Sequence, residues 1–364
     1  MSKRAIVIVL DGCGAGAAPD AANYNDAHGP STLKNVWNAC GGLNTPLLTK
    51  LGWWAAAGIG EAPSTATYGR LKPMGKGKDS VTGHWEMMGA RVTEAFPTYP
   101  DGFPIPLVKE FEKRIGTQTL GNRPASGTAI LDELGELHVE TGFPILYTSA
   151  DSVFQVAAHE DVVPIETLYE WCRMGREICQ APDQVQRVIA RPFIGQPGAW
   201  KRTERRKDFP VLPPVCLVDE LDPIHGIGVI PELFGGRGFL DLPRTQSNGE
   251  HAKALFSALE TDHPFIFANF EDFDMLFGHR SDPKGFGKCL EEFDVFLADL
   301  LPRLKPDDLI ILTADHGNDP TDPSTDHTRE YVPFVKFGQM VDAGALGDQD
   351  GFEVVGDTVK SWIS

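Results

Sequence analysis

The stretch Ala5–Gly12 reads AIVIVLDG, and it indicates the class of fold that this chain adopts. Its continuous β-branched run is typical of a strand buried on both faces in the middle of a parallel sheet. Two later stretches share this design, Pro264–Phe270 (PFIFANF) and Leu309–Thr313 (LIILT), and each also leads into acidic residues. Because ligands of open α/β sheets bind beyond the carboxyl ends of the strands, these acidic residues are expected to meet in one crevice. The sequence therefore predicts an α/β fold with a mostly parallel central sheet.

The middle of the chain has a different pattern, with amphipathic helices between short strands. The expected helices are Pro104–Ile115, Ala129–Thr141 and Ile165–Cys179, and the expected strands are Ile145–Tyr147 and Val188–Ala190. We expect Arg202–Asp208 to be an exposed loop and the proline-rich Phe209–Val215 to be a linker. Residues 93–212 are therefore predicted to form an inserted α+β domain. Residues 1–92 and 213–364 are predicted to form the core.

The formal net charge of −18 makes nucleic acids and anionic membrane surfaces unlikely partners, because surplus Lys and Arg bind phosphate backbones. An acidic enzyme can still bind phosphates if metal ions or a local arginine cluster reverse the field at the site. The first apolar run is too short for a signal peptide, and no stretch approaches the roughly 20 apolar residues of a membrane span. We expect a cytoplasmic protein, and no feature of the sequence indicates a protein partner.

Carboxylates and imidazoles follow the predicted strands in three places. Asp and His together suit Mn, Zn or Fe, and Mg less well. Any one of these residues alone is more readily explained as a helix cap or a surface polar group. As a set, they have the number and type expected for two cations a few ångströms apart. The candidate ligands are Asp11, Asp274, His279, Asp315, His316 and His327.

A candidate nucleophile, Thr82, lies in the polar stretch Gly75–Glu86 (GKGKDSVTGHWE). A threonine hydroxyl is a weak nucleophile until a metal or a base activates it. Without the metal set, an ordinary loop threonine is the better interpretation. The lysines of this stretch do not form the G-x-x-x-x-G-K-[ST] phosphate loop.

The stretch Tyr147–Ser152 (YTSADS) contains Ser149 and Asp151, which suit the hydroxyls of a sugar. Arg191 and the cluster around Arg206 suit phosphate, because the planar guanidinium binds it through two hydrogen bonds. Each arginine alone is more readily explained as a solvated surface charge. Together these residues predict a binding site for a polyhydroxylated anion.

The chain resembles the bacterial phosphopentomutases, which belong to the alkaline phosphatase superfamily and are related to the cofactor-independent phosphoglycerate mutases. The motifs that carry the resemblance keep the family order and are spread over nearly the whole chain. They are DGxG at Asp11, Lys76–Gly89, Gly121–Thr128, Tyr147–Glu160, Arg187–Gly195, Asp272–Arg280 and Thr313–Pro333.

The resemblance implies an alkaline-phosphatase-like core with helices flanking the sheet, an inserted cap domain and two Mn²⁺ ions. It implies that Thr82 carries the phosphoryl group and that Asp151, Arg191 and Arg206 contact the sugar phosphate, with Ser149 as a further candidate contact. It also divides the metal ligands into two sets. One set is Asp11, Asp315 and His316, and the other is Asp274, His279 and His327.

The implied activity is an isomerase reaction that interconverts ribose or deoxyribose 1-phosphate and 5-phosphate. It runs through a bisphosphate intermediate and is primed by a sugar bisphosphate. Gly12 stands where the family usually has Ser, and Val229 where it tends to have a Lys that contacts substrate phosphate. A related mutase for another sugar phosphate is therefore an alternative. Others are a phosphatase or phosphodiesterase of the same superfamily and, from another class, a metal-stabilised binding protein without activity.

Overall fold

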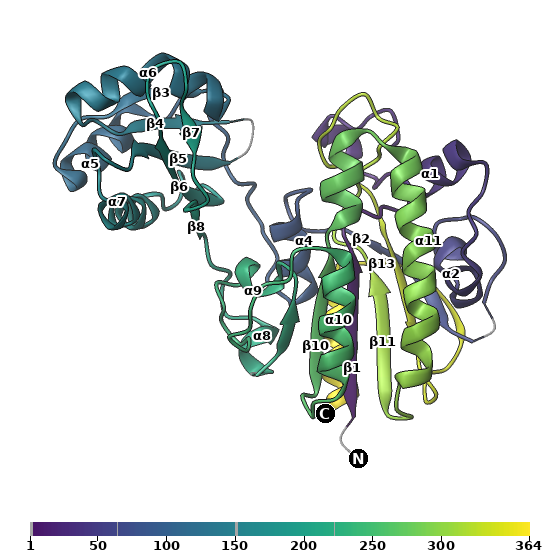
Figure 1. Cartoon of the computed structure of the whole chain (residues 1–364). Helices are drawn as coiled ribbons and strands as arrows, with labels where there is room; N and C mark the ends of the chain where they lie inside the picture. The colour runs from purple at the N-terminus through teal and green to yellow at the C-terminus, as the bar shows by residue number, and fades with distance from the viewer. Residues whose placement is uncertain (1–2, 64, 150–151, 222) are drawn as a thin grey trace. The chain divides into compact units, whose positions relative to one another are not determined.

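The computed structural model describes residues 3–63, 65–149, 152–221 and 223–364, and Figure 1 gives the element labels. Contacts divide the chain into two compact units, each described here by itself. The first unit comprises Met1–Glu94 and Pro213–Ser364, and the second comprises Ala95–Leu212. Asp151, one of the predicted substrate contacts, lies outside the described residues.

The first unit is built on a sheet with the strand order β13-β2-β12-β11-β1-β10-β9. Its centre is formed by β1 (Arg4–Leu10), which pairs in parallel with both β10 (Phe265–Phe270) and β11 (Asp308–Thr313). All three strands are buried along their whole length. The prediction that these strands are buried on both faces is therefore confirmed, and the structure shows in addition that the three are neighbours in the sheet.

The remaining strands extend this sheet on both sides. β9 (His225–Ile227) runs parallel to β10, while β12 (Val332–Phe337) runs antiparallel to both β11 and β2 (Thr67–Lys72). β13 (Gly344–Asp350) pairs in parallel with β2 at the edge. Among the described strands of this sheet only β12 opposes the others, so the sheet is mostly parallel, as predicted.

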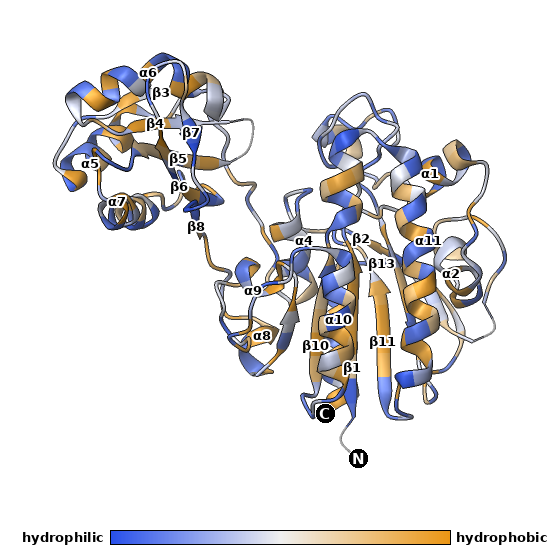
Figure 2. Ribbon diagram, in the orientation of Figure 1, coloured by the Kyte–Doolittle hydropathy of each residue, from blue (hydrophilic) through white to orange (hydrophobic). Residues whose placement is uncertain are grey.

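Helices cover the sheet because its strands are apolar on both faces. Figure 1 shows α10 and α11 lying over one face, and α12 packs on β1 and α4. Figure 2 shows hydrophobic central strands beneath helices that carry both hydrophobic and hydrophilic residues. The helices of this unit are α1 (Thr32–Cys40), α2 (Pro46–Leu51), α3 (Trp53–Ala56), α4 (Ser80–Met87), α8 (Leu217–Glu220), α9 (Ile230–Leu233), α10 (Asn248–Leu259), α11 (Pro283–Leu300) and α12 (Glu353–Ile363).

The second unit is an α+β domain whose sheet has the order β3-β4-β5-β6-β7, with β8 also paired to β6. Alternate residues of β4 pack into two separate cores, Leu146 in one, Ile145 and Tyr147 in the other. Both faces of the sheet are therefore covered, one by α6 and the other by α5 and α7. The bounds are α5 (Ile105–Ile115), β3 (Leu120–Pro124), α6 (Gly127–Thr141), β4 (Ile145–Thr148), β5 (Val153–His159), α7 (Ile165–Ile178), β6 (Arg187–Ile194), β7 (Lys201–Arg202) and β8 (Lys207–Pro210).

One prediction for this unit is wrong at its ends. The segment Arg202–Asp208 is not a loop throughout, because Arg202 ends strand β7 and Lys207 begins strand β8. β8 pairs with β6 and places Phe209, predicted to lie in a linker, opposite Val188 and against the hydrophobic core. Pairing with β6 overrides the weak strand propensity of a charged segment.

None of the described helices combines the length and the apolar character that crossing a membrane requires.

Candidate active site

The sheet of the first unit brings carboxylates from distant parts of the sequence together. Val9 of β1 lies opposite Thr313 of β11, so Asp11 and Asp315 follow neighbouring strand ends. His316 Nε2 lies 3.4 Å from Asp11 Oδ1 and 3.3 Å from Asp315 Oδ2. These three buried side chains can offer ligand atoms that all lie within 4.8 Å of one another.

A second group lies next to the first and shares His316 with it. Asp274, His316 and His327 also place their possible ligand atoms within 4.8 Å of one another. The rings of His316 and His327 stack with centroids 3.9 Å apart. His279 Nε2 lies 3.1 Å from both His327 Nε2 and Asp274 Oδ2. The structure thus gathers all six candidate ligands and makes His316 common to both groups, a feature that the sequence did not indicate.

Backbone carbonyls orient two of these imidazoles. The carbonyl of Thr325 lies 2.6 Å from His279 Nδ1, and that of Gly317 lies 3.2 Å from His316 Nδ1. A carbonyl can only accept, so each Nδ1 is the protonated nitrogen that donates. Each Nε2 is then left to face the carboxylates. Outer hydrogen bonds of this kind fix the tautomer and the ring orientation of metal-binding histidines.

The protonation equilibria of the two groups differ. Burial, the Asp315 charge and the Asp274 charge hold the pKa of Asp11 well above its usual range. Burial also disfavours ionised Asp274, but His327 and His279 override it and hold the pKa of Asp274 well below its usual range. Burial likewise opposes the charged form of His327, yet Asp274 raises the pKa of His327 to about 9. In the first group, neighbouring negative charges thus disfavour the ionised form of Asp11, whereas in the second group the histidines favour the ionised form of Asp274.

The donor set fits divalent cations. Asp11 Oδ1 and Asp315 Oδ2 are buried and have no hydrogen-bond partner within the described residues. Leaving charged oxygens unpaired in the interior is costly, and a cation removes that cost. The opposite oxygens are held by Asn269 Nδ2, 2.6 Å from Asp11 Oδ2, and by the backbone N–H of Gly12, 3.2 Å from Asp315 Oδ1. The free oxygens thus point into the cluster as ligands would.

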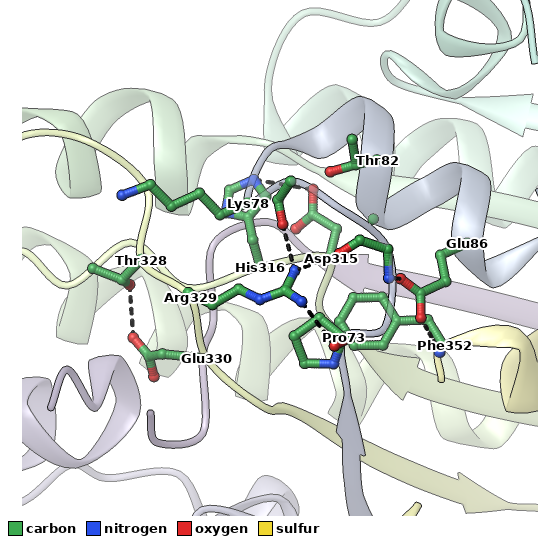
Figure 3. Close-up of a pocket in the computed structure, with 13 residues that line it drawn as sticks. Pro73, Lys78, Thr82, Glu86, Asp315, His316, Thr328, Arg329, Glu330 and Phe352 are labelled. Carbon is green, nitrogen blue, oxygen red and sulfur yellow. Dashed lines mark hydrogen bonds and ion pairs between the residues drawn. The ribbon is translucent and has the colours of Figure 1, made fainter. Parts of the chain in front are cut away.

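Thr82 lies in the first turn of helix α4, beside this cluster, and is 4% exposed. Ser80 Oγ of the same helix lies 3.1 Å from His316 Nε2. Figure 3 shows Thr82 on α4 together with Asp315 and His316 among the residues that line one pocket. The structure therefore places the candidate nucleophile at the candidate ligand cluster.

Gly83 permits this close approach of α4 to the strand end. A Cβ atom at Gly83 would lie 2.2 Å from the backbone oxygen of Asp315, closer than real Cβ atoms come. We predict that Gly83→Ala lowers the free energy of unfolding by about 1–3 kcal/mol, the usual cost of overpacking. Thermal melts and metal titration would measure the loss of stability and of metal affinity.

Gly249 offers a matched control within helix α10, because a Cβ there would meet nothing within 4 Å. Gly249→Ala should leave stability unchanged or raise it by up to about 1 kcal/mol, since alanine is the better helix former. Equal behaviour of the two variants would contradict the close approach at Gly83.

Several contributors to the site were not predicted from the sequence. Asn318 Nδ2 donates to Asp274 Oδ1 at 2.6 Å, and Asn269 holds Asp11 as described above. His84 is fully buried, with its Nδ1 3.4 Å from Asp315 Oδ2. A polar Asn in the apolar strand Phe265–Phe270 was a signal for Asn269. His84 and Asn318 lie within or beside motifs already quoted.

Arg329 fixes the loop that precedes α4. It donates hydrogen bonds to the carbonyls of Pro73, Gly75 and Gly77, and it pairs with Asp20 at 2.9 Å. Figure 3 shows this guanidinium, with Glu86 and Phe352 nearby. Because Arg329 follows His327 by two residues, it connects the candidate ligand loop to the loop before Thr82. Only its place in the fold reveals this role.

The second unit contains a cavity of about 320 Å³ with a basic lining. Among the predicted substrate contacts, Ser149, Arg191 and Arg206 line it, and Asp151 lies outside the described residues. Arg187, Gln155 and Gly127, which the sequence did not indicate, also line it, together with Arg202. Four arginines around one cavity create a local positive field within an acidic protein.

Neighbouring polar side chains hold these arginines in place. Asp208 accepts two hydrogen bonds from Arg206, at 2.7 and 2.6 Å, and Gln155 Oε1 accepts one from Arg191 Nε at 3.0 Å. Burial, Arg206 and, to a smaller degree, Arg202 lower the pKa of Arg191. An anion entering the cavity would relieve this like-charge repulsion.

Comparison with known proteins agrees with these observations. A family model described as the Metalloenzyme superfamily matches residues 234–363. The phosphopentomutase of Dictyoglomus thermophilum is 48% identical, covering 100% of this chain and 95% of its own. That of Anaeromyxobacter sp. (strain K) is 47% identical, covering 100% and 96%. The solved structure of PH0037 protein from Pyrococcus horikoshii matches with a TM-score of 0.53 and 16% identity, covering 100% and 97%, and shows likeness of fold alone.

The mostly parallel α/β sheet, the clustered carboxylates and imidazoles, and the match to the Metalloenzyme superfamily model indicate the class of protein, an α/β enzyme with a candidate divalent-metal site. Within that class, the chain belongs to the phosphopentomutase family. It is therefore a phosphomutase, an enzyme of the isomerase type that acts on a small molecule.

Proposed function

We propose that this enzyme moves a phosphoryl group between the O1 and O5 positions of ribose or deoxyribose phosphate, with Thr82 as the covalent carrier. The observation that carries the proposal is the position of the buried Thr82 hydroxyl beside a cluster with unpartnered carboxylate oxygens. Phosphoryl transfer depends mainly on positioning and on neutralising charge, and these residues can do both.

The proposed cofactors are two divalent cations, with Mn²⁺ as the first candidate. Asp11, Asp315 and His316 would hold one, and Asp274, His279 and His327 the other, with His316 near both groups. When bound, such ions neutralise charge on the transferring phosphoryl group and lower the pKa of a nearby hydroxyl. Mixed carboxylate and imidazole donors favour Mn over Mg.

In the proposed cycle, phospho-Thr82 transfers its group to the free hydroxyl of a sugar monophosphate. The Thr82 Oγ–P bond breaks as the new sugar O–P bond forms, which gives a sugar bisphosphate. The bisphosphate then returns its other phosphoryl group to Thr82, and the isomeric monophosphate leaves. A sugar bisphosphate would prime the unphosphorylated enzyme by the second of these steps.

The second unit, Ala95–Leu212, corresponds to the inserted domain predicted for residues 93–212, and we propose that it acts as a cap domain that recognises the sugar phosphate. Arg191 and Arg206 would bind phosphate, and Ser149 and Asp151 would bind sugar hydroxyls. The basic cavity and its prepositioned guanidinium groups support this assignment. We also propose a cytoplasmic location, since all six cysteines are unpaired.

Replacement of Arg206 tests the substrate site. Arg206→Ala should raise KM for the sugar phosphate by about 10–100-fold, because a charge-assisted hydrogen bond contributes about 1.5–3 kcal/mol. Arg114→Ala is a matched control: Arg114 has the same side-chain exposure of 42% and pairs with Glu110 and Glu177 in the same unit. Steady-state kinetics would compare them, and equal KM values would exclude Arg206 from binding.

The preferred sugar is open to an alternative. Val229 is the N-cap residue of α9 (Ile230–Leu233). Its side chain has no hydrogen-bond donor, whereas the family tends to have a lysine at this position. A related mutase for another sugar phosphate is the second candidate. A panel of pentose and hexose 1-phosphates under one set of conditions would rank the substrates by kcat/KM.

A coupled assay of purified, Mn²⁺-loaded enzyme tests the proposed reaction. The enzyme is primed with a sugar bisphosphate and offered ribose 1-phosphate, and both ribose 5-phosphate and free phosphate are measured. Ribose 5-phosphate without free phosphate is the expected result. Free phosphate as the main product would show a phosphatase and overturn the proposal.

A further inference from the structure

Asp79 holds both the helix that carries Thr82 and the Thr82 side chain itself. It is the N-cap residue of α4, where its Oδ1 accepts from the backbone N–H groups of Val81, at 3.0 Å, and Thr82, at 3.1 Å. Its Oδ2 lies 3.1 Å from Thr82 Oγ1, and its backbone oxygen lies 2.9 Å from that same hydroxyl. One residue therefore contacts the candidate nucleophile through both its main chain and its side chain.

The loop before α4 also confines the Thr82 side chain. A Cβ atom at Gly77 would lie 2.6 Å from both Cγ2 and Oγ1 of Thr82, so the loop before α4 packs directly against this side chain. A threonine in a helix otherwise divides between two rotamers. Contacts from Asp79 and Gly77 select one orientation of Oγ1.

We propose that Asp79 is the positioning residue of the phosphoryl relay. Its Oδ1 fixes the start of α4, while its Oδ2 holds the Thr82 hydroxyl in the rotamer used for phosphoryl transfer. This inference rests on the proposed function, in which Thr82 is the phosphoryl acceptor. Holding a reacting atom in place lowers the barrier because the entropy of orientation is lost before the reaction.

Two substitutions separate this role from simple helix capping. Asp79→Ser keeps one side-chain oxygen for the backbone N–H groups, and Ser is as good an N-cap as Asp. Serine has no second side-chain oxygen to accept the hydrogen bond that Thr82 Oγ1 donates to Asp79 Oδ2. Asp79→Ala removes both interactions. Ser247→Ala is the control for the loss of a helix cap. Ser247 is the N-cap residue of α10, and its side chain accepts a hydrogen bond from the backbone N–H of Glu250.

The experiment follows phosphorylation of each metal-loaded variant by a sugar bisphosphate in a single turnover. Intact mass gives the rate at a temperature where every variant is folded. We expect Asp79→Ser and Asp79→Ala to react about 10–100-fold more slowly than the unmodified enzyme, as expected for loss of a hydrogen bond to a charged group. Ser247→Ala should react at the unmodified rate.

Melting temperatures supply the second readout. Asp79→Ala and Ser247→Ala should each melt about 2–4 °C lower, and Asp79→Ser should melt like the unmodified protein. An unmodified phosphorylation rate in Asp79→Ser would overturn the inference and leave Asp79 as a cap alone. If the unmodified enzyme itself gains no phosphoryl group, the proposed function fails. This outcome differs from an unchanged rate in the Asp79 variant, which overturns only the positioning role of Asp79.

Discussion

Thr82→Ala is expected to lose mutase activity by about 10⁴–10⁶-fold, the range found when a covalent nucleophile is removed. The hydrogen bond with Asp79 and the contact with Gly77 hold the Thr82 hydroxyl itself, so its removal takes away the proposed phosphoryl acceptor. Loss of its hydrogen bonds should lower the free energy of unfolding by only about 1 kcal/mol. The variant should therefore fold, bind metal and remain inactive in the coupled assay.

Thr82→Ser is the matched control for this loss. Serine keeps the hydroxyl and the hydrogen bonds with Asp79, and it lacks only the Cγ2 methyl that packs against Gly77. It should retain far more activity than the alanine variant. If Thr82→Ala retained activity comparable to that of Thr82→Ser, the relay would not pass through residue 82.

Asp315→Asn is expected to have opposite effects on activity and on the stability of the metal-free protein. Activity should fall by about 1,000-fold or more, since a metal contributes several kcal/mol of charge stabilisation. Stability without metal should rise, because the charge of Asp315 is one of the causes, after burial, of the raised pKa of Asp11. Each unit of that shift corresponds to about 1.4 kcal/mol.

The raised pKa of Asp11 beside Asp315 also determines how the stability of the metal-free protein changes with pH. A carboxyl whose folded pKa is raised stabilises the fold below its unfolded pKa, and this stability is lost as the pH rises through the folded pKa. The metal-free enzyme should therefore become less stable as the pH rises above the ordinary range of Asp, and Asp315→Asn should show a smaller decline. Thermal melts across pH, with chelator and with Mn²⁺, would measure it. An equal decline in both proteins would contradict the repulsion between Asp11 and Asp315.

The sequence predicted the sheet centre well because burial on both faces leaves a simple pattern. Ala5–Leu10 and its two counterparts are predominantly apolar runs, and they form the adjacent strands β1, β10 and β11. Acidic residues at the ends of such strands have few structural reasons to be there. The six candidate ligands could therefore be proposed from the sequence alone.

Other features depend on contacts between distant segments, which a local pattern does not contain. Strand β8 exists because Lys207–Pro210 pairs with β6, although its charges suggested a loop. The sharing of His316 by both groups arises from its stacking on His327, eleven residues further along the chain. Arg329 likewise holds the loop before Thr82 through a long-range hydrogen bond. Gln155 holds the Arg191 side chain in the same way.

Intact mass analysis of the unmodified enzyme, loaded with Mn²⁺ and incubated with a sugar bisphosphate, tests the central claim most directly. The account predicts a gain of one phosphoryl group, located on Thr82 by peptide mapping and removed when ribose 1-phosphate is added. Full mutase turnover with no covalent phosphoryl group, or with the group on another residue, would contradict it.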